Sequence, residues 1–130
     1  MINTAIPFNL NDLSNKIIRL AIKVHRALGP GLLESAYKEC LFYEILRAGH
    51  SAEKEKSLPL VYEEVKLDIG YRIDILVENK LVIEVKSIDS LTDIHTAQVL
   101  TYLKLSDNRL GLLINFNVKL LKNGIKRLVL

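Results

Sequence analysis

The chain has 130 residues, a formal net charge of +3 at pH 7, 49% hydrophobic residues and 25% charged residues. These values are ordinary for one soluble globular domain, and with no run of 18 apolar residues we expect no membrane partner. The single cysteine, Cys40, excludes an intrachain disulfide framework and a cluster of thiolates around a metal. Because the N-terminus lacks a signal-like pattern, we expect a cytoplasmic protein in a reducing compartment.

The N-terminal residues predict an arm followed by a helix. We expect an irregular arm over residues 1–10 and a single domain over residues 11–130. Apolar residues recur at helical spacing from about Asn11 to Leu28, and Gly29 is typical of a helix end. The helix also carries a stripe of four basic residues, Lys16, Arg19, Lys23 and Arg26. This stripe is either a solvated face or a ridge that contacts the phosphates of a nucleic acid.

The middle of the chain predicts a second helix, one or more strands and a third helix. The second helix is expected from about Leu32 to Arg47. Residues 52–69 alternate loosely and are expected to hold one or two strands around Pro59. Thr92 is a good N-cap for a helix from Asp93 to about Leu105.

The C-terminal part predicts further strands. The apolar run from Leu110 to Phe116 is suited to a buried strand. Asn123-Gly124 is a strong turn signal, so we expect a hairpin that joins Val118–Lys122 to Ile125–Leu130. The order of these elements predicts an α/β sandwich in which a central mixed β-sheet is flanked by helices.

Residues 74–86 predict a hairpin that carries three charged side chains. Two apolar runs rich in β-branched residues flank a polar turn. Asp74 lies on the first run, and Glu84 and Lys86 lie two residues apart on the second, so these last two share a face. Two carboxylates held together are destabilising without compensation, and a divalent cation is the natural compensation.

The length of the turn decides where Asp74 lies. If residues 78–80 form a three-residue loop, Val77 pairs with Leu81, and counting back pairs Asp74 with Glu84. Directly paired side chains lie about 4.5–5.5 Å apart at Cβ, which would bring the two carboxylates together. A two-residue loop would place Asp74 on the opposite face.

The charged pattern of this hairpin resembles a known family. Asp74 followed by Glu84-Val85-Lys86 is similar to the core motif of the PD-(D/E)XK nuclease superfamily. The resemblance runs from about His25 to the C-terminus. Ile73 stands in place of the proline that gives the superfamily its name, a position that varies among its members.

Two further motifs accompany this core in the right order. The run Gly31-Leu32-Leu33-Glu34-Ser35-Ala36-Tyr37 resembles the motif that names the GxxExxY family of the superfamily. Gln98 and Tyr102 resemble the Gln-X-X-X-Tyr signature on the helix after the hairpin. Because these two residues lie one helical turn apart, we expect both to face the hairpin patch.

The resemblance implies the fold and the chemistry. It implies a three-layer PD-(D/E)XK-like sandwich and a nuclease-like domain that uses Mg²⁺ or Mn²⁺ to hydrolyse phosphodiester bonds, with DNA favoured as the nucleic-acid partner. It implies metal ligation by Asp74, Glu84 and the Val85 carbonyl, with Glu34 completing the site directly or through water. Such ions prefer oxygen ligands and lower the pKa of a bound water.

The resemblance also assigns roles to residues around the metal. Lys86 would orient or activate the attacking water and offset developing charge. Gln98 and Tyr102 would contact the scissile phosphate or a metal-bound water. From the predicted register, Arg72 would share the face of Asp74 and could contact the DNA backbone.

The same residues have ordinary structural explanations. A helix dipole stabilises an acidic residue in the first turn by ~0.3–1 kcal/mol, which alone could explain Glu34. Lys86 could form a cross-strand ion pair, and Gln98 and Tyr102 could be a polar stripe in water. Tyr37 could fill the core. The alternative function is a non-catalytic assembly module on the nuclease scaffold that binds nucleic acid or protein, with a homodimer or a protein partner.

Overall fold

The computed structural model describes residues 9–130, which form three helices, five strands and one short 3₁₀ helix. The elements are α1 (Leu10–Leu28), α2 (Glu34–Arg47), β1 (Ala52–Tyr62), β2 (Val65–Val77), β3 (Leu81–Lys86), α3 (Asp93–Ser106), β4 (Leu110–Asn115), η1 (Leu121–Gly124) and β5 (Ile125–Val129). The predicted arm lies outside the described residues except at its end, where Asn9 caps α1 and Leu10 begins it.

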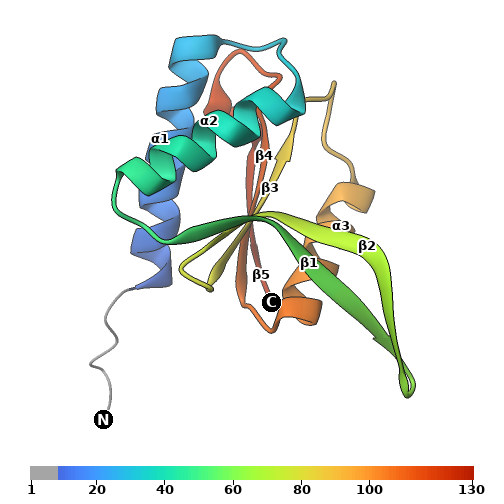
Figure 1. The fold of residues 1–130 in the computed structure, drawn as a ribbon. Coiled ribbons are helices and arrows are strands. Elements are labelled where there is room, and N and C mark those ends of the chain that lie inside the picture. Colours follow the sequence, from blue (N-terminus) through green and yellow to red (C-terminus); the bar gives the residue numbers. More distant parts are fainter. Residues whose placement is uncertain (1–8) are drawn as a thin grey trace.

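The five strands form one mixed sheet with the order β1-β2-β3-β4-β5. β3 and β4 run parallel, and the other neighbouring strands run antiparallel. Figure 1 shows α1 and α2 on one side of this sheet and α3 on the other. The three-layer α/β sandwich that the sequence predicts is therefore confirmed.

Each face of the sheet has its own apolar core, because the side chains of a strand alternate between faces. The larger core packs α1 and α2 on the sheet and includes Ile17, Leu41 and Ile83. The smaller core lies under α3 and includes Val82 and Leu103. β3 contributes to both cores and is buried from its first residue to its fifth, so a charged side chain on it lies in an enclosed place.

The helix ends follow local signals in the sequence. The Asn9 side chain accepts a hydrogen bond from the Asn11 N–H at 2.7 Å, and Gly29 ends α1 with a φ of +70°. Before α3, the Thr92 N–H donates to the His95 Nδ1 at 2.9 Å, which completes the predicted cap. The predicted helix boundaries are confirmed to within two residues. Among residues 9–130, none of the helices is long and apolar enough to cross a membrane.

β1 and β2 are much longer than β3 and extend beyond the sandwich as a hairpin (Figure 1). The predicted strands around Pro59 are therefore confirmed as β1 and the first part of β2. Pro59 is tolerated because β1 is an edge strand, where a missing N–H breaks no interior ladder. The register shifts between Leu58 and Leu60, at this proline.

The hairpin predicted at Asn123-Gly124 is wrong. Residues 121–124 form η1, and β5 pairs with β4 instead of with Val118–Lys122. Gly124 is needed here for close approach, because a Cβ at this position would overlap the Asn115 carbonyl oxygen. The sequence therefore marks a position that requires glycine, but the reason is the close approach to Asn115 and not a hairpin turn.

Gly124→Ala should destabilise the fold by about 1–3 kcal/mol, because the added methyl meets backbone that cannot rotate away. Thermal melting should show a midpoint lowered by about 5 °C or more. Asn123→Ala is the matched control, since Asn123 is exposed and adjacent. Equal melting points for the two variants would contradict the close approach.

Candidate active site

The turn between β2 and β3 has the predicted length. Residues 78–80 connect the strands, and Val77 pairs with Leu81. The pairing continues to Ile75 opposite Ile83. The predicted register of the hairpin is therefore confirmed along this stretch.

Asp74 lies where β2 leaves β3. The paired residues stop at Ile75, so Asp74 does not pair directly with Glu84, which corrects the predicted arrangement. Instead, the Val85 N–H donates a hydrogen bond to the Asp74 Oδ2 at 2.8 Å. Because a strand N–H lies near the plane of its sheet, the carboxylate occupies the gap between the two strands. Repulsion between directly opposed carboxylates is a physical reason for the strands to part here.

The side chains of β2 on either side of Asp74 pack into different cores. Ile75 packs in the core under α1 and α2, whereas Ile73 packs in the core under α3. Regular alternation would keep both on one face, so the strand twists at Asp74. The twist leaves the Asp74 side chain 8% exposed and in neither apolar core.

Glu84 is the most isolated carboxylate of the site. The residue is 5% exposed, and its Oε1 has no hydrogen-bond partner among residues 9–130. Its Oε2 lies 3.3 Å from the Lys86 Nζ. Burial, and then the charge of Asp74, raises the pKa of Glu84 to about 8, although Lys86 acts in the opposite direction. A buried carboxylate oxygen without a partner is costly, so this site favours a proton or a cation.

A chain of polar contacts joins Lys86 to α3. The Lys86 Nζ donates to the Gln98 Oε1 at 3.5 Å, and the Gln98 Nε2 donates to the Tyr102 hydroxyl at 3.2 Å. Burial, and then the charges of Glu84 and Asp74, raises the pKa of Tyr102. The expected approach of Gln98 and Tyr102 to the hairpin patch is therefore present.

Glu34 lies at the exposed rim of this cluster, as the first residue of α2. Partial burial, and then the charge of Asp74, raises the pKa of its carboxyl group, while Lys86 and Lys38 lower it. Glu34 therefore interacts electrostatically with Asp74 from the side of the sheet that α2 covers, opposite to α3.

Tyr37 has a structural role. Its hydroxyl donates to the Gly29 carbonyl at 2.5 Å and accepts from the Leu32 N–H at 3.1 Å. Its ring stacks on Phe116 with 4.6 Å between ring centroids. These contacts hold the loop before α2, and therefore the start of the helix that carries Glu34.

Two residues near Asp74 were not predicted from the sequence to belong to the site. The Lys38 Nζ donates to the Glu55 Oε1 at 2.8 Å. Burial raises the pKa of Asp74; the Val85 N–H and the charge of Lys38 lower it, and the charge of Glu55 raises it. Lys38 lies one helical turn after Glu34, and this spacing could have identified it. Glu55 lies across from Asp74 on β1 with a φ of +54°, and no sequence signal marks that position.

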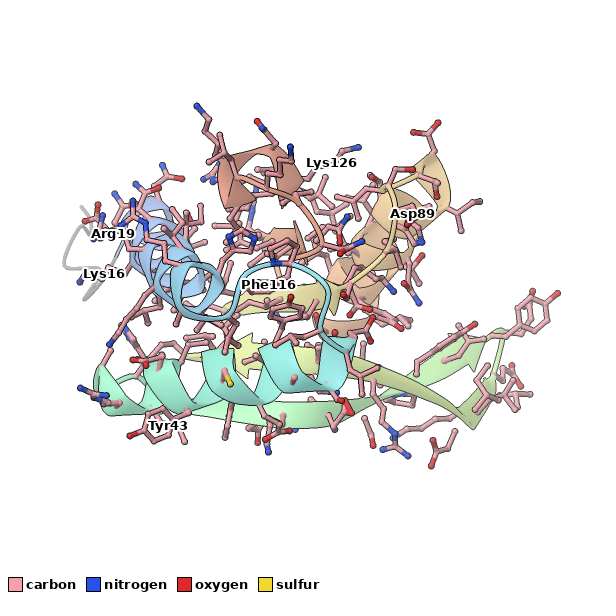
Figure 2. All side chains as sticks on the ribbon, turned by 90° about the horizontal axis from the view of Figure 1, so that it is seen from above. Lys16, Arg19, Tyr43, Asp89, Phe116 and Lys126 are labelled. Carbon is pink, nitrogen blue, oxygen red and sulfur yellow. The ribbon has the colours of Figure 1, made fainter. Side chains whose placement is uncertain are left out.

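The basic stripe on α1 is separate from this cluster. Lys16 and Arg19 project from the side of α1 that is turned away from α3 (Figure 2). Lys23 forms an ion pair with Glu44 at 3.0 Å. The stripe is exposed, so its predicted contact with nucleic acid stays a prediction.

Arg26 and Arg72 lie in two other places. Arg26 lines a hollow of about 380 Å³ together with Lys119 and Lys122, two cations that were not identified from the sequence. The Arg72 Nη1 donates to the Ser57 Oγ at 2.9 Å across β1 and β2. Arg72 is exposed two residues before Asp74, so it is the predicted nucleic-acid contact nearest in sequence to the carboxylates.

Residues 11–128 of the chain match a family model that is described as the PD-(D/E)XK nuclease superfamily. The chain belongs to this superfamily. The part of the chain that resembles its motif is Asp74 with Glu84-Val85-Lys86, with Ile73 in place of the proline. Neither a comparison with curated proteins nor one with solved structures gave a match.

PD-(D/E)XK nucleases generally use divalent metal ions, and the donors present here fit such an ion. Among residues 9–130, no three side chains of His, Cys, Asp or Glu gather closely enough to hold a metal by themselves. Divalent ions also accept main-chain oxygens and water. The Lys86 carbonyl accepts from the Phe116 N–H toward β4, so alternation turns the Val85 carbonyl toward β2 and Asp74. The candidate donors are therefore Asp74, the Val85 carbonyl and the unpartnered Glu84 Oε1.

The raised pKa of Glu84 should make metal-free stability fall as pH rises. The folded protein holds a proton on Glu84 up to about pH 8, whereas the unfolded chain releases it near the ordinary glutamate pKa of 4.5. The stabilisation is therefore fully present below about pH 4.5 and is lost as pH rises to about 8. Thermal melting of wild type and Glu84→Gln between pH 5 and pH 9 isolates this effect.

The melting point of wild type relative to Glu84→Gln should drop across that range. Titrating groups that do not interact with Glu84 cancel in the comparison, because both proteins carry them. With Mg²⁺ present the trend should reverse, since the metal needs the ionised carboxylate. A difference that is constant with pH would show that Glu84 titrates normally.

Proposed function

We propose that this chain is a Mg²⁺- or Mn²⁺-dependent nuclease that hydrolyses phosphodiester bonds in DNA. The observation that carries the proposal is the buried Glu84 carboxylate, which has one unpartnered oxygen and lies between Asp74 and Lys86. A structural ion pair would satisfy both oxygens, whereas a metal ligand keeps one oxygen free. Membership of the nuclease superfamily supports the same reading.

Asp74, Glu84 and the Val85 carbonyl would hold the metal, and Glu34 would act from the rim through a water. A bound divalent ion screens the charge of the phosphodiester and lowers the pKa of a bound water. The Val85 N–H fixes the Asp74 carboxylate, so this ligand needs little reorganisation on binding. Because this carboxylate is already held in place, less conformational entropy is lost when the metal binds.

Lys86 would orient the attacking water and offset negative charge that develops on the phosphate. Its side chain is only 16% exposed and its ammonium is held between Glu84 and Gln98, so its direction is fixed. Gln98 and Tyr102 would contact the scissile phosphate or a metal-bound water. Both are linked to Lys86 by the hydrogen-bonded chain, which supports a shared role.

We also assign the chain to the GxxExxY branch of the superfamily, on its own residues. Gly31 adopts a φ of +97°, which favours glycine, in the loop that Tyr37 holds. Glu34 follows this loop at the start of α2. The motif then serves to present one carboxylate to Asp74. A cytoplasmic location belongs to the same proposal and rests on the sequence alone.

The test is cleavage by the purified protein of single- and double-stranded DNA and RNA, with Mg²⁺, Mn²⁺ or a chelator. Metal-dependent cleavage of DNA that is lost in Glu84→Gln is the expected result. Calorimetry with Mn²⁺ on the same two proteins should show binding only by wild type. Binding of nucleic acid with neither cleavage nor metal binding would instead support a non-catalytic module.

A further inference from the structure

The hairpin of β1 and β2 has two chemically different faces outside the sandwich. Cross-strand partners share a face, and three apolar pairs stack toward the tip: Leu58 with Tyr71, Leu60 with Leu67, and Tyr62 with Val65. The pairs on the other face are Ser57 with Arg72 and Val61 with Lys66. We call residues 58–71 the arm and the three apolar pairs its apolar face.

The apolar face continues the core under α3 into solvent. Leu58 belongs to that core, and the Tyr71 ring lies 6.2 Å from the Tyr102 ring between centroids. Beyond this point the side chains lose cover: Tyr62 is 67% exposed and Val65 is 51% exposed. Figure 1 shows the tip of the arm apart from all three helices.

An exposed apolar hairpin of this kind is typical of a surface that binds a partner. An isolated two-stranded hairpin is at best marginally stable in water, and contiguous exposed apolar patches mark interaction sites. The rest of the sandwich cannot cover this face, because α3 already packs on the smaller core at its base.

We propose that the arm is a dimerisation element, and that its apolar face packs on the same face of a second copy of this chain. A two-fold interface joins the same patch of both copies, and an uncharged patch can pack on its own copy without repulsion between like charges. The inference does not depend on nuclease activity.

The charges on the arm argue against nucleic acid as the occupant. Between Leu58 and Tyr71 the apolar pairs include no lysine or arginine, which phosphate binding requires. The tip carries Glu63 and Glu64, which would repel phosphates. The cations of the arm, Lys66 and Arg72, belong to pairs on the opposite face.

The charges also fix the direction of the pairing. Two arms side by side with their tips together would bring four glutamates into one place. Antiparallel packing separates the tips and carries Glu63 and Glu64 toward the base of the other arm, where Lys56 lies. The apolar face is small, because Leu58 is buried and Leu67 and Tyr71 are each only 37% exposed, so we expect a weak dimer rather than a standard interface of about 1,200–2,000 Å².

Sedimentation of the full chain from about 1 to 100 µM tests this, with neighbouring residues as a matched pair of variants. Tyr62→Lys changes the apolar face, and Val61→Lys changes the opposite face at a residue of similar exposure, 60%. Wild type and Val61→Lys should dimerise alike. Tyr62→Lys should weaken dimerisation by about 10²-fold.

Both positions are exposed, so both variants should keep the wild-type circular dichroism, and their melting points should match that of wild type at concentrations where wild type is monomeric. A wild type that remains monomeric at the highest concentration would overturn the proposal. So would equal effects of the two variants. A change in DNA affinity for Tyr62→Lys without a change in mass would assign the arm to nucleic acid instead.

Discussion

Replacing Asp74 with asparagine should abolish Mn²⁺ binding and DNA cleavage while the protein stays folded. The amide removes the negative charge that holds the cation but keeps an oxygen that can accept from the Val85 N–H. Loss of several kcal/mol of charge stabilisation corresponds to a rate reduced by about 10³-fold or more. Calorimetry and cleavage assays on the same sample measure both effects.

Asp74→Ala separates the structural role from the metal. Without metal, relief of repulsion with Glu84 favours the variant, but the Val85 N–H loses its acceptor, which costs about 1–3 kcal/mol. We therefore expect Asp74→Ala to melt below Asp74→Asn in a chelator. An Asp74→Asn protein that binds Mn²⁺ normally and still cuts DNA would end the assignment of Asp74 as a ligand.

Replacing Lys86 with alanine should reduce turnover by about 10²–10⁴, the range for a positioned proton-transfer group. The structure adds an effect on the metal. The charge of Lys86 lowers the pKa of Glu84, so its loss keeps Glu84 protonated to higher pH and weakens metal binding at pH 7. Turnover measured at saturating Mn²⁺ across pH 7–9 separates the two effects.

At the alkaline end of that range, Lys86→Ala should bind Mn²⁺ almost as wild type does and still cut slowly. Lys104→Ala is the control, because Lys104 is an exposed lysine on α3. Full recovery of turnover at high pH would show that Lys86 acts only through the pKa of Glu84. Wild-type cleavage by Lys86→Ala at every pH would remove it from the mechanism.

The sequence by itself determined the three helices and offered the observed hairpin register as one of two possibilities. Helical periodicity and end signals such as Gly29 and Thr92 act within a few residues, so they located all three helices. Because both apolar runs are buried on both faces, their pattern did not choose between the two loop lengths, and the structure has the three-residue loop between Val77 and Leu81. The same local information brought Asp74 and Glu84 to neighbouring strands.

Only the tertiary structure decided how these groups meet. The sequence placed Asp74 directly opposite Glu84, but the twist that moves β2 from one core to the other depends on helices distant in the chain. Glu55 reaches Lys38 through a backbone conformation with no sequence signal. Asn123-Gly124 is typical of a turn, but Gly124 instead packs closely on the Asn115 carbonyl. The strand that follows, β5, pairs with β4. Periodicity reports which face is buried, whereas the partner on that face is chosen by packing between distant segments.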